Sequence, residues 1–404
     1  MDGSAILEAL MSPEGRENPY PYYAAAHGLG PAAPLADGLW IVTGYDAVDQ
    51  AFRAPTLVPW EDRFDRPFLT DWRDHPSLVS LTRSLLDSNP PDHTRMRHAM
   101  AGAFTARRVA DLEPSIARIA DELIETIAQK GAGGSPIDYM EEFAFRMSVA
   151  VISELFGVPV GDRPRLRRLG ADWTEVFEVI PSPEGIAAAD AAFLSFKEYF
   201  EDLVALRRKE PGDDLVSAVV QAAGQPDSRL DDEELICNLA VLLVAGYETT
   251  TNLFGNGLGQ LFKHPEVADG LRSGEVSAEN FVQEVLRYDS PVQVAGRIVL
   301  QDQEIAGSVI PAGTFAILLI GAANRDPARY PDPDAFDPAR EDVKPASFGA
   351  GIHRCLGAAL AELEGSVSFT RLLKRFPQIA PAGDPTRRER LVLRGYQSMP
   401  ITVS

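Results

Sequence analysis

Residues 348–357 read FGAGIHRCLG and place a single cysteine, Cys355, in a glycine-rich turn. The run AALAELE at 358–364 follows and favours a helix, because alanine, leucine and glutamate are strong helix formers. A thiolate that ligates a metal needs close backbone donors, which glycine permits, and a positive potential, which the start of a helix supplies. It also needs open space on one side for a cofactor. A lone cysteine near a helix start is otherwise most often a small buried apolar residue, so the rest of the chain has to decide.

Length and charge limit the classes of protein to consider. The 404 residues exceed the roughly 250–300 at which a single core usually stops growing, so one large domain with a smaller lobe and two domains both stay open. Apolar content of 45% and charged content of 24% are typical of a globular protein. The formal net charge of −21 argues against nucleic acid and anionic membrane surfaces as partners.

Cysteine usage and the N-terminus indicate the compartment. The chain has two cysteines, and Cys237 lies in the apolar run LICNLAVLLV at 235–244, where a buried thiol is expected. Such sparse cysteine fits a reducing compartment. The N-terminus MDGSAILE lacks the basic-then-apolar layout of a signal peptide, and no segment approaches the ~18 apolar residues of a membrane span. We therefore expect a cytoplasmic protein without a membrane segment.

Hydrophobic periodicity predicts a mainly helical chain. Helices are expected near residues 93–106, 107–130, 139–156, 163–178, 186–209, 214–223, 231–262 and 278–288. Alternating or β-branched stretches at 39–43, 297–301, 314–319 and 391–403 predict strands, and their distance in sequence implies one small, non-local sheet beside the helices. The Pro- and Asp-rich segment 324–347 is expected to be a long ordered loop.

Residues 245–252 read AGYETTTN, in the centre of the helix expected at 231–262. Threonine hydroxyls can bond back to helix carbonyls and, together with glycine, can locally distort a helix and make room for small molecules. An acid beside a hydroxyl is also the pair of residue types that proton delivery requires. The alternative interpretation is a β-branched patch on a buried helix, in which a carboxylate is an unusual member.

Glu284 and Arg287 stand at positions i and i+3 of the helix expected at 278–288, on one face. Such pairs are usually solvated and contribute little to stability. This pair lies in an apolar helix before Tyr288 and Pro291, so partial burial is expected.

The three segments together resemble the haem-ligating signature, the oxygen-activation motif and the Glu-x-x-Arg pair of the cytochromes P-450. The resemblance runs from about residue 90 to the C-terminus. It implies a single catalytic domain over residues 1–404 with the cytochrome P-450 fold, a helix-rich bulk and a small β-rich lobe from both ends of the chain. It also implies haem b with Cys355 as the axial thiolate.

The same resemblance assigns roles to individual residues. It implies that Thr249 hydrogen-bonds O2 at the haem, that Glu248 relays protons to it, and that Glu284, Arg287 and Arg340 form a structural lock on the loop before Cys355. The implied haem-binding residues are His93, Arg97, Arg297, Phe348, Gly349, His353, Cys355 and Gly357. The candidate substrate contacts are Leu242, Ala245, Val292, Val294, Ala295, Tyr396 and Gln397. Aromatic residues of two further segments are weaker candidates for the substrate cavity, because such residues usually form core: Trp60, Phe64, Phe68, Trp72, Trp173 and Phe177, with Ile180.

The implied reaction is the insertion of one oxygen atom of O2 into a mid-sized lipophilic substrate, by hydroxylation or epoxidation, in the tailoring of a bacterial natural product. A ferredoxin and its reductase would supply electrons to a monomeric protein, with a basic patch at Arg107, Arg108, Arg354, Arg371, Lys374 and Arg375 as one candidate docking face. Glu362 and Pro345 depart from the family's usual residues and place that face in question. A peroxide-driven or isomerising haem-thiolate enzyme is the alternative that stays open, although such relatives usually lose the acid–threonine pair.

Overall fold

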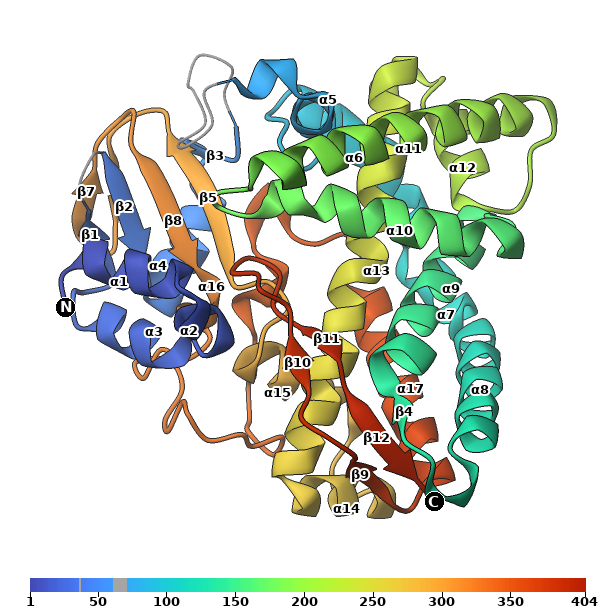
Figure 1. Ribbon diagram of the computed structural model, residues 1–404. Coiled ribbons are helices and arrows are strands. Elements are labelled where there is room, and N and C mark those ends of the chain that lie inside the picture. The colour runs from blue at the N-terminus through green and yellow to red at the C-terminus, as the bar shows by residue number, and fades with distance from the viewer. Residues whose placement is uncertain (36–37, 61–70) are drawn as a thin grey trace. The chain divides into compact units, whose positions relative to one another are not determined.

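Helices dominate the computed structural model, which describes residues 1–35, 38–60 and 71–404 (Figure 1). The chain divides into two compact units. The first unit contains residues 1–58, 113–147 and 249–404, and the second contains residues 59–112 and 148–248. The boundaries between them fall inside two helices, α9 (Phe145–Phe156) and α13 (Asp232–Lys263). The expectation of one catalytic domain over the whole chain stays a prediction.

The remaining helices belong to one unit each. In the first unit they are α1 (Gly3–Met11), α2 (Pro13–Glu17), α3 (Tyr20–His27), α4 (Tyr45–Arg53), α8 (Glu113–Lys130), α14 (Pro265–Ser273), α15 (Ala278–Tyr288), α16 (Ile320–Ala323) and α17 (Ala358–Arg375). In the second unit they are α5 (Pro76–Thr82), α6 (Asp92–Ala101), α7 (Ala106–Asp111), α10 (Arg163–Trp173), α11 (Pro183–Lys209) and α12 (Leu215–Ala222). The mainly helical fold class is confirmed.

Helix α8 shows how the sequence pattern produces these helices. Its buried residues include Ile116, Ile119, Ala120, Ile124 and Ile127, which recur at the three- and four-residue spacing of one helix face. The opposite face carries charged side chains. Burial of one apolar stripe against the unit's core therefore stabilises the helix, as the periodicity predicts.

The main sheet lies in the first unit and joins strands from distant parts of the chain, as predicted (Figure 1). Its order is β1 (Ala32–Pro34), β2 (Leu39–Val42), β8 (Phe315–Leu319), β5 (Val294–Val299) and β3 (Leu57–Val58). Strand β2 runs parallel to β8, and β5 runs antiparallel to β8. Buried residues of α4, among them Val48 and Ala51, pack on the apolar side chains of this sheet.

The prediction of one sheet is wrong for residues 391–403. These residues form β11 (Tyr396–Ser398), which pairs with β10 (Thr386–Arg387), and β12 (Pro400–Val403), which pairs with β4 (Ile137–Asp138) and β9 (Ile379–Pro381). A further hairpin consists of β6 (Gln303–Ile305) and β7 (Ser308–Ile310). Strands of two or three residues carry too little periodicity to be read from sequence.

Helix α17, which follows Cys355, packs closely on α13 and α15 in the first unit. A methyl group added at Gly257 of α13 would lie 2.4 Å from the Phe369 ring, and one at Gly365 would lie 2.8 Å from the Val282 side chain. Small residues at these positions therefore let the helices approach one another. Among the described residues, no helix is both long and apolar enough to cross a membrane.

This packing buries an acidic side chain, Glu364 of α17, which is 1% exposed. Its Oε2 atom has no hydrogen-bond partner among the described residues. Burial raises the pKa of Glu364 well above the usual range of a glutamate. The folded protein therefore holds a proton there that the unfolded chain releases above about pH 4.3.

We expect the Glu364→Gln substitution to flatten the pH dependence of stability. Because the folded state binds the extra proton, the free energy of unfolding of the natural protein falls as pH rises from about 4.3 toward the folded pKa, by at most about 1.4 kcal/mol per pH unit. Glutamine is neutral in both states and removes this slope, so the variant gains stability at neutral pH relative to pH 4. Urea unfolding across pH, with exposed Glu8→Gln on α1 as the matched control, measures the effect. Parallel pH profiles for the natural protein and Glu364→Gln would contradict it.

Candidate functional site

The loop that carries Cys355 depends on two glycines with positive φ. Gly349 has φ 62° and Gly351 has φ 66°, a region that favours glycine. A methyl group at Gly351 would also lie 2.6 Å from the carbonyl oxygen of Phe52 on α4. The loop closes where the Cys355 N–H donates to the Phe348 carbonyl over 2.8 Å. Only glycine at 349 and 351 allows the chain to make this turn against α4.

The thiol of Cys355 lies at an open, electropositive position. Helix α17 begins at Ala358, and its N-cap, Gly357, offers no side chain to bond the first N–H groups of the helix. The partial positive charge of that helix end favours a thiolate. Cys355 is exposed, and a methyl group at Gly357 would meet no heavy atom within 4 Å. The site thus combines the glycine turn, the helix end and the open face that thiolate ligation requires.

The other cysteine has the opposite environment. Cys237 of α13 is 1% exposed and in no disulfide. Burial, followed by the charge of Glu233, raises the pKa of its thiol to about 12. Cys237 is therefore a neutral, inert thiol, as its apolar run predicts.

Cationic candidates lie in both units. In the first unit, Arg297 of β5 is 8% exposed, donates to the Gly296 carbonyl over 2.7 Å and lies over the Phe52 ring. His353 is the last residue of the short helical turn η9 (Gly351–His353), two residues before Cys355, and it is half-buried. In the second unit, α6 carries buried His93 and half-buried Arg97.

The charge state of His93 follows from its surroundings. Burial, and then the nearby charge of Arg97, lowers the pKa of His93 to about 4. The imidazole is therefore neutral at pH 7. It can donate a hydrogen bond to an anion but adds no positive charge, whereas Arg97 supplies the cation on this helix.

Helix α13 carries the candidate catalytic pair. Glu248 is 1% exposed in the second unit, and Thr249 is half-buried in the first. Leu242 is buried, while Ala245, one turn before Thr249, is exposed. Ala245 is thus an exposed position in the largely buried middle of α13.

The expected helix distortion at Gly246 does not appear. Helix α13 runs as one α-helix from Asp232 to Lys263. A methyl group at Gly246 would lie 2.5 Å from the Ile152 side chain of α9. This glycine therefore permits close helix packing within the second unit rather than a bulge. A π-helical turn occurs instead at Met140–Ala144, ahead of α9.

The structure brings Glu284, Arg287 and Arg340 together in the first unit. Glu284 and Arg287 are completely buried and form a two-pronged ion pair, with both N–O distances 2.7 Å. The Nε atom of Arg340 lies 3.4 Å from Glu284 Oε1. Burial is thus complete, where the sequence predicts only partial burial.

Arg287 also organises the loop that leads to Cys355. Its guanidinium donates to the carbonyls of Asn324, Pro333 and Ala335 over 2.8–3.0 Å. Glu284 in turn accepts from the Asp337 N–H over 2.8 Å. Segment 324–345 contains no helix or strand, so these directed bonds hold it in place.

The substrate candidates near β5 and the C-terminal hairpin divide into two groups. Val292 is half-buried and forms an isolated bridge with Leu393, and half-buried Ala295 and buried Val294 pair with β8. Tyr396 is 5% exposed, and a methyl group at Gly259 of α13 would lie 2.9 Å from its hydroxyl oxygen. Tyr396 therefore packs into the core against α13.

Gln397, in contrast, is exposed. The hairpin residues next to Val292 are instead Val392 and Leu393, which were not among the candidates. Their β-branched and apolar types are the signal that the sequence offered.

The aromatic candidates of the second unit form core clusters. The rings of Trp60 and Trp72 are 4.7 Å apart, and Trp173 is 0% exposed beside Phe193 and Phe196. Phe177 also contacts Trp173, whereas Ile180 is exposed. Phe64 and Phe68 lie outside the described residues.

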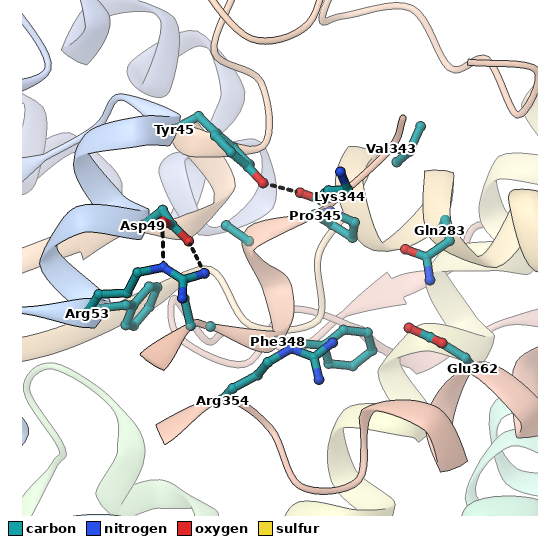
Figure 2. A pocket seen from close by; sticks show the side chains of 14 residues that line it. Tyr45, Asp49, Arg53, Gln283, Val343, Lys344, Pro345, Phe348, Arg354 and Glu362 are labelled. Atoms are coloured by element: carbon teal, nitrogen blue, oxygen red, sulfur yellow. Dashed lines mark hydrogen bonds and ion pairs between the residues drawn. The ribbon is translucent and has the colours of Figure 1, made fainter. Parts of the chain in front are cut away.

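A pocket of about 360 Å³ lies in the first unit. The loop before Cys355 forms one of its walls (Figure 2). Phe348, Gly349, Ala350 and Arg354 line it from that loop, and Gln283 and Glu362 line it from α15 and α17. On the α4 side, the Tyr45 hydroxyl donates to the Lys344 carbonyl over 2.6 Å, and Arg53 pairs with Asp49. The pocket therefore presents charges of both signs next to the cysteine loop.

Three of the six cations of the candidate basic patch have an acidic partner among the described residues. Arg371 and Arg375 of α17 bond Asp121 and Glu125 of α8 over 2.6 and 2.9 Å. In the second unit, Arg108 lies 4.0 Å from Asp213. In the first unit, Arg354 on the pocket wall is an exposed cation.

Comparison with known proteins gives concordant results. The family model "Cytochrome P450" matches residues 38–276 and 277–398. The cytochrome P450 monooxygenase PikC of Streptomyces venezuelae is 36% identical over 95% of this chain and 91% of its own length. The vitamin D(3) 25-hydroxylase of Pseudonocardia autotrophica is 38% identical over 96% and 94%. The solved structure of the cytochrome P450 PksS of the Bacillus subtilis 168 bacillaene polyketide synthase superposes with a TM-score of 0.85 at 32% identity, covering 98% of this chain and 99% of PksS.

Proposed function

The chain belongs to the cytochrome P450 family, and from this premise we propose that it oxidises a mid-sized lipophilic compound by hydroxylation or epoxidation, as a tailoring step in a bacterial biosynthesis. It is a haem-thiolate monooxygenase, and the identity of its substrate is the part that we propose. The observation that carries the proposal is the exposed thiol of Cys355 at the electropositive start of α17, in the same chain as the Glu248–Thr249 pair.

The residues present fit haem. The open face at Gly357 leaves room beside the thiol for a flat group, and no side chain of α17 caps the helix end. Arg297 in the first unit, and Arg97 with neutral His93 in the second, are suitable donors for propionate carboxylates. Cys355 would hold the haem iron through its thiolate, since buried Cys237 retains its proton. Haem held by a thiolate supplies the activation of O2.

The chain's own residues manage protons and water. The reaction consumes O2, two electrons and two protons and gives oxidised substrate and water, so two protons must be delivered where O2 is reduced. We assign the carboxyl group of Glu248 to hold a proton and the hydroxyl of Thr249, the next residue, to pass it on. In the first unit, Val292, Val294 and Ala295 are apolar and suit a lining that excludes water.

The names of relatives support the substrate class. One relative is named as a hydroxylase of vitamin D(3), a lipophilic compound, and another belongs to a polyketide synthase system. The similarity of this chain to both relatives extends over the whole fold and is not confined to one motif. We therefore propose a lipophilic natural product of polyketide or terpenoid type, with a ferredoxin and its reductase as the electron source.

Turnover with purified ferredoxin and ferredoxin reductase tests the proposal. Compounds that shift the spin state of the haem are incubated with reductant and isotopically labelled O2. One labelled oxygen atom in the product is the expected result. Unlabelled product, or product that forms only with added hydrogen peroxide, would support the peroxide-driven or isomerising alternative.

We expect Glu248→Gln and Thr249→Val to lower product formation by about a hundredfold, a typical loss for one proton-transferring group. Reductant consumption should continue in Thr249→Val, because the electrons are then diverted to peroxide. The matched control is Thr251→Val, an isosteric change at a fully buried position two residues along α13. Equal ratios of product to consumed reductant in Thr249→Val and Thr251→Val would overturn the role of Thr249.

A further inference from the structure

A buried charge cluster lies at the C-terminal end of α15 in the first unit. We call it the Asp289 hub; it consists of Asp289, Arg387, Arg394, Asn256 and Tyr20. Asp289 is 1% exposed and accepts hydrogen bonds from Arg387 over 2.9 Å, from Arg394 over 2.8 Å and from the Tyr20 hydroxyl over 2.6 Å. Every polar atom of its carboxylate is therefore engaged.

The hub joins elements from the whole length of the first unit. The Asn256 amide of α13 donates to the carbonyls of Asp289 and Arg394 over 2.8 and 3.1 Å and accepts from Arg387 over 3.2 Å. Arg394 also donates to the carbonyls of Arg16 and Glu17, which end α2. The hub thus connects α2, α13, α15 and both arms of the C-terminal hairpin.

Electrostatics keep the hub in one charge state. Burial alone would raise the pKa of Asp289, but the charges of Arg387 and Arg394 outweigh it and hold that pKa well below the usual range. Burial and the Asp289 charge raise the pKa of Tyr20 to about 12, so its hydroxyl stays a donor. The bonds of the hub therefore persist across the physiological pH range.

Pairing between β10 and β11 alone fixes the register of this ribbon poorly, although β12 pairs in register with β4 and β9. Strands β10 and β11 pair at two positions, Thr386 with Ser398 and Arg387 with Tyr396, and the register shifts between them. An isolated two-stranded ribbon is marginal in water, and a slip of one residue turns each side chain to the other face. The directed bonds of Arg387 and Arg394 add fixed contacts that this short ladder lacks.

The register of the hairpin matters because the hairpin pairs with residues 291–293, which lead into β5. We call residues 291–293 and 391–393 the wall. The Gln293 N–H donates to the Val392 carbonyl, and the Arg394 N–H donates to the Pro291 carbonyl, each over 2.9 Å. Leu393 forms the bridge to Val292. Residues 291–293 are therefore joined to residues 391–394 by backbone pairing.

The same segment lies directly on the catalytic helix. A methyl group at Gly395 would lie 2.0 Å from Oδ1 of Asn252, so the backbone of the hairpin contacts α13 there. Asn252 stands three residues after Thr249 and shares its face of the helix. A change in hairpin register would thus displace the wall relative to Thr249.

We propose that the Asp289 hub fixes the register of the C-terminal hairpin on α13 and thereby positions the wall of residues 291–293 and 391–393 over Thr249, which sets the shape of the substrate cavity. This inference rests on the proposed function. Apolar residues often replace buried ion clusters without loss of stability, and the best-attested use of such clusters is to specify register. Arg387 and Tyr396 are positioning residues, which explains why Tyr396 lies in the core.

The test measures cavity shape separately from haem. In the holoenzyme, dissociation constants are determined spectroscopically for imidazole, which reports access to the iron, and for 4-phenylimidazole, which also contacts the cavity wall. We expect Arg387→Met to change the ratio of the two constants by about tenfold, equivalent to one charged hydrogen bond, with the imidazole value unchanged. Arg387→Lys should restore most of the ratio. Exposed Arg272→Met on α14 is the matched control.

The outcomes separate this inference from the proposed function. A ratio within about twofold of the natural protein in a folded Arg387→Met variant would overturn the role of the hub. If Arg387→Met does not fold, Tyr396→Phe, which removes only the hydroxyl that accepts from Arg387 over 2.9 Å, decides by the same ratio. A natural protein that binds no imidazole and shows no thiolate spectrum would contradict the proposed function instead.

Discussion

The Cys355→Ala variant is expected to lose the strongly red-shifted Soret band of the reduced, carbon-monoxide-bound protein and all monooxygenase activity. Cys355 supplies the thiolate because its exposed sulfur precedes the uncapped start of α17 in a turn that only glycines at 349 and 351 permit. Alanine removes the ligand without disturbing the turn. The reduced carbon-monoxide difference spectrum of both proteins, with haem content measured in parallel, is the direct measurement.

The matched control for this variant is Cys237→Ala. Cys237 is 1% exposed, and burial raises the pKa of its thiol to about 12, so its removal leaves only a small cavity. The band should persist there at full intensity. A red-shifted band in Cys355→Ala that disappears in Cys237→Ala would reverse the assignment of the ligand and all that depends on it.

Local pattern was sufficient for the helices that bury one apolar face. Helix α8 and helix α13 follow the three- and four-residue spacing of their apolar residues, and α13 begins and ends within one residue of the predicted range. Helix α8 ends where predicted, but it begins at Glu113 because residues 106–111 form the separate helix α7. Helix α1 was missed although Ile6, Leu7 and Leu10 are buried at helical spacing and Asp2 caps its first turn. The spacing of these apolar residues and the N-cap are the local signals that identify this helix.

The sequence did not predict which strands pair or which distant residues contact a given side chain. Strand β4 has two residues, and it is recognisable as a strand only because it pairs with β12. The role of Tyr396 likewise depends on Arg387 from the other arm of the hairpin and on Gly259 from α13. An aromatic residue in a hairpin has the same local sequence whether it faces a ligand or a helix.

At Gly246 the sequence pattern and the structure differ. A glycine close to three threonines predicts a distorted helix. The physical outcome depends on what faces the glycine, and here the Ile152 side chain occupies that space. The Glu284–Arg287 spacing was visible as an i, i+3 pair, but the carbonyls that Arg287 bonds lie 37 to 48 residues away. Tertiary context therefore decided between a weak surface pair and a buried lock.

The lock leads to the prediction with the largest effect on stability. We expect Arg287→Met to destabilise the protein by about 3–5 kcal/mol, because it leaves the charge of Glu284 buried without its main partner. It also removes the donors to the carbonyls of Asn324, Pro333 and Ala335, which hold the loop before Cys355. Haem content should fall along with the free energy of unfolding.

The control substitution keeps the chemistry and changes only the burial. Arg329→Met, in the same loop, breaks the ion pair of Arg329 with Asp342, in which the two side chains are 27% and 58% exposed. This substitution should lower the free energy of unfolding by less than about 1 kcal/mol. Urea unfolding and haem content of both variants decide the matter. If Arg287→Met were as stable as Arg329→Met, the loop would be held by its prolines and turns, and the buried pair would be a consequence of the fold rather than its cause.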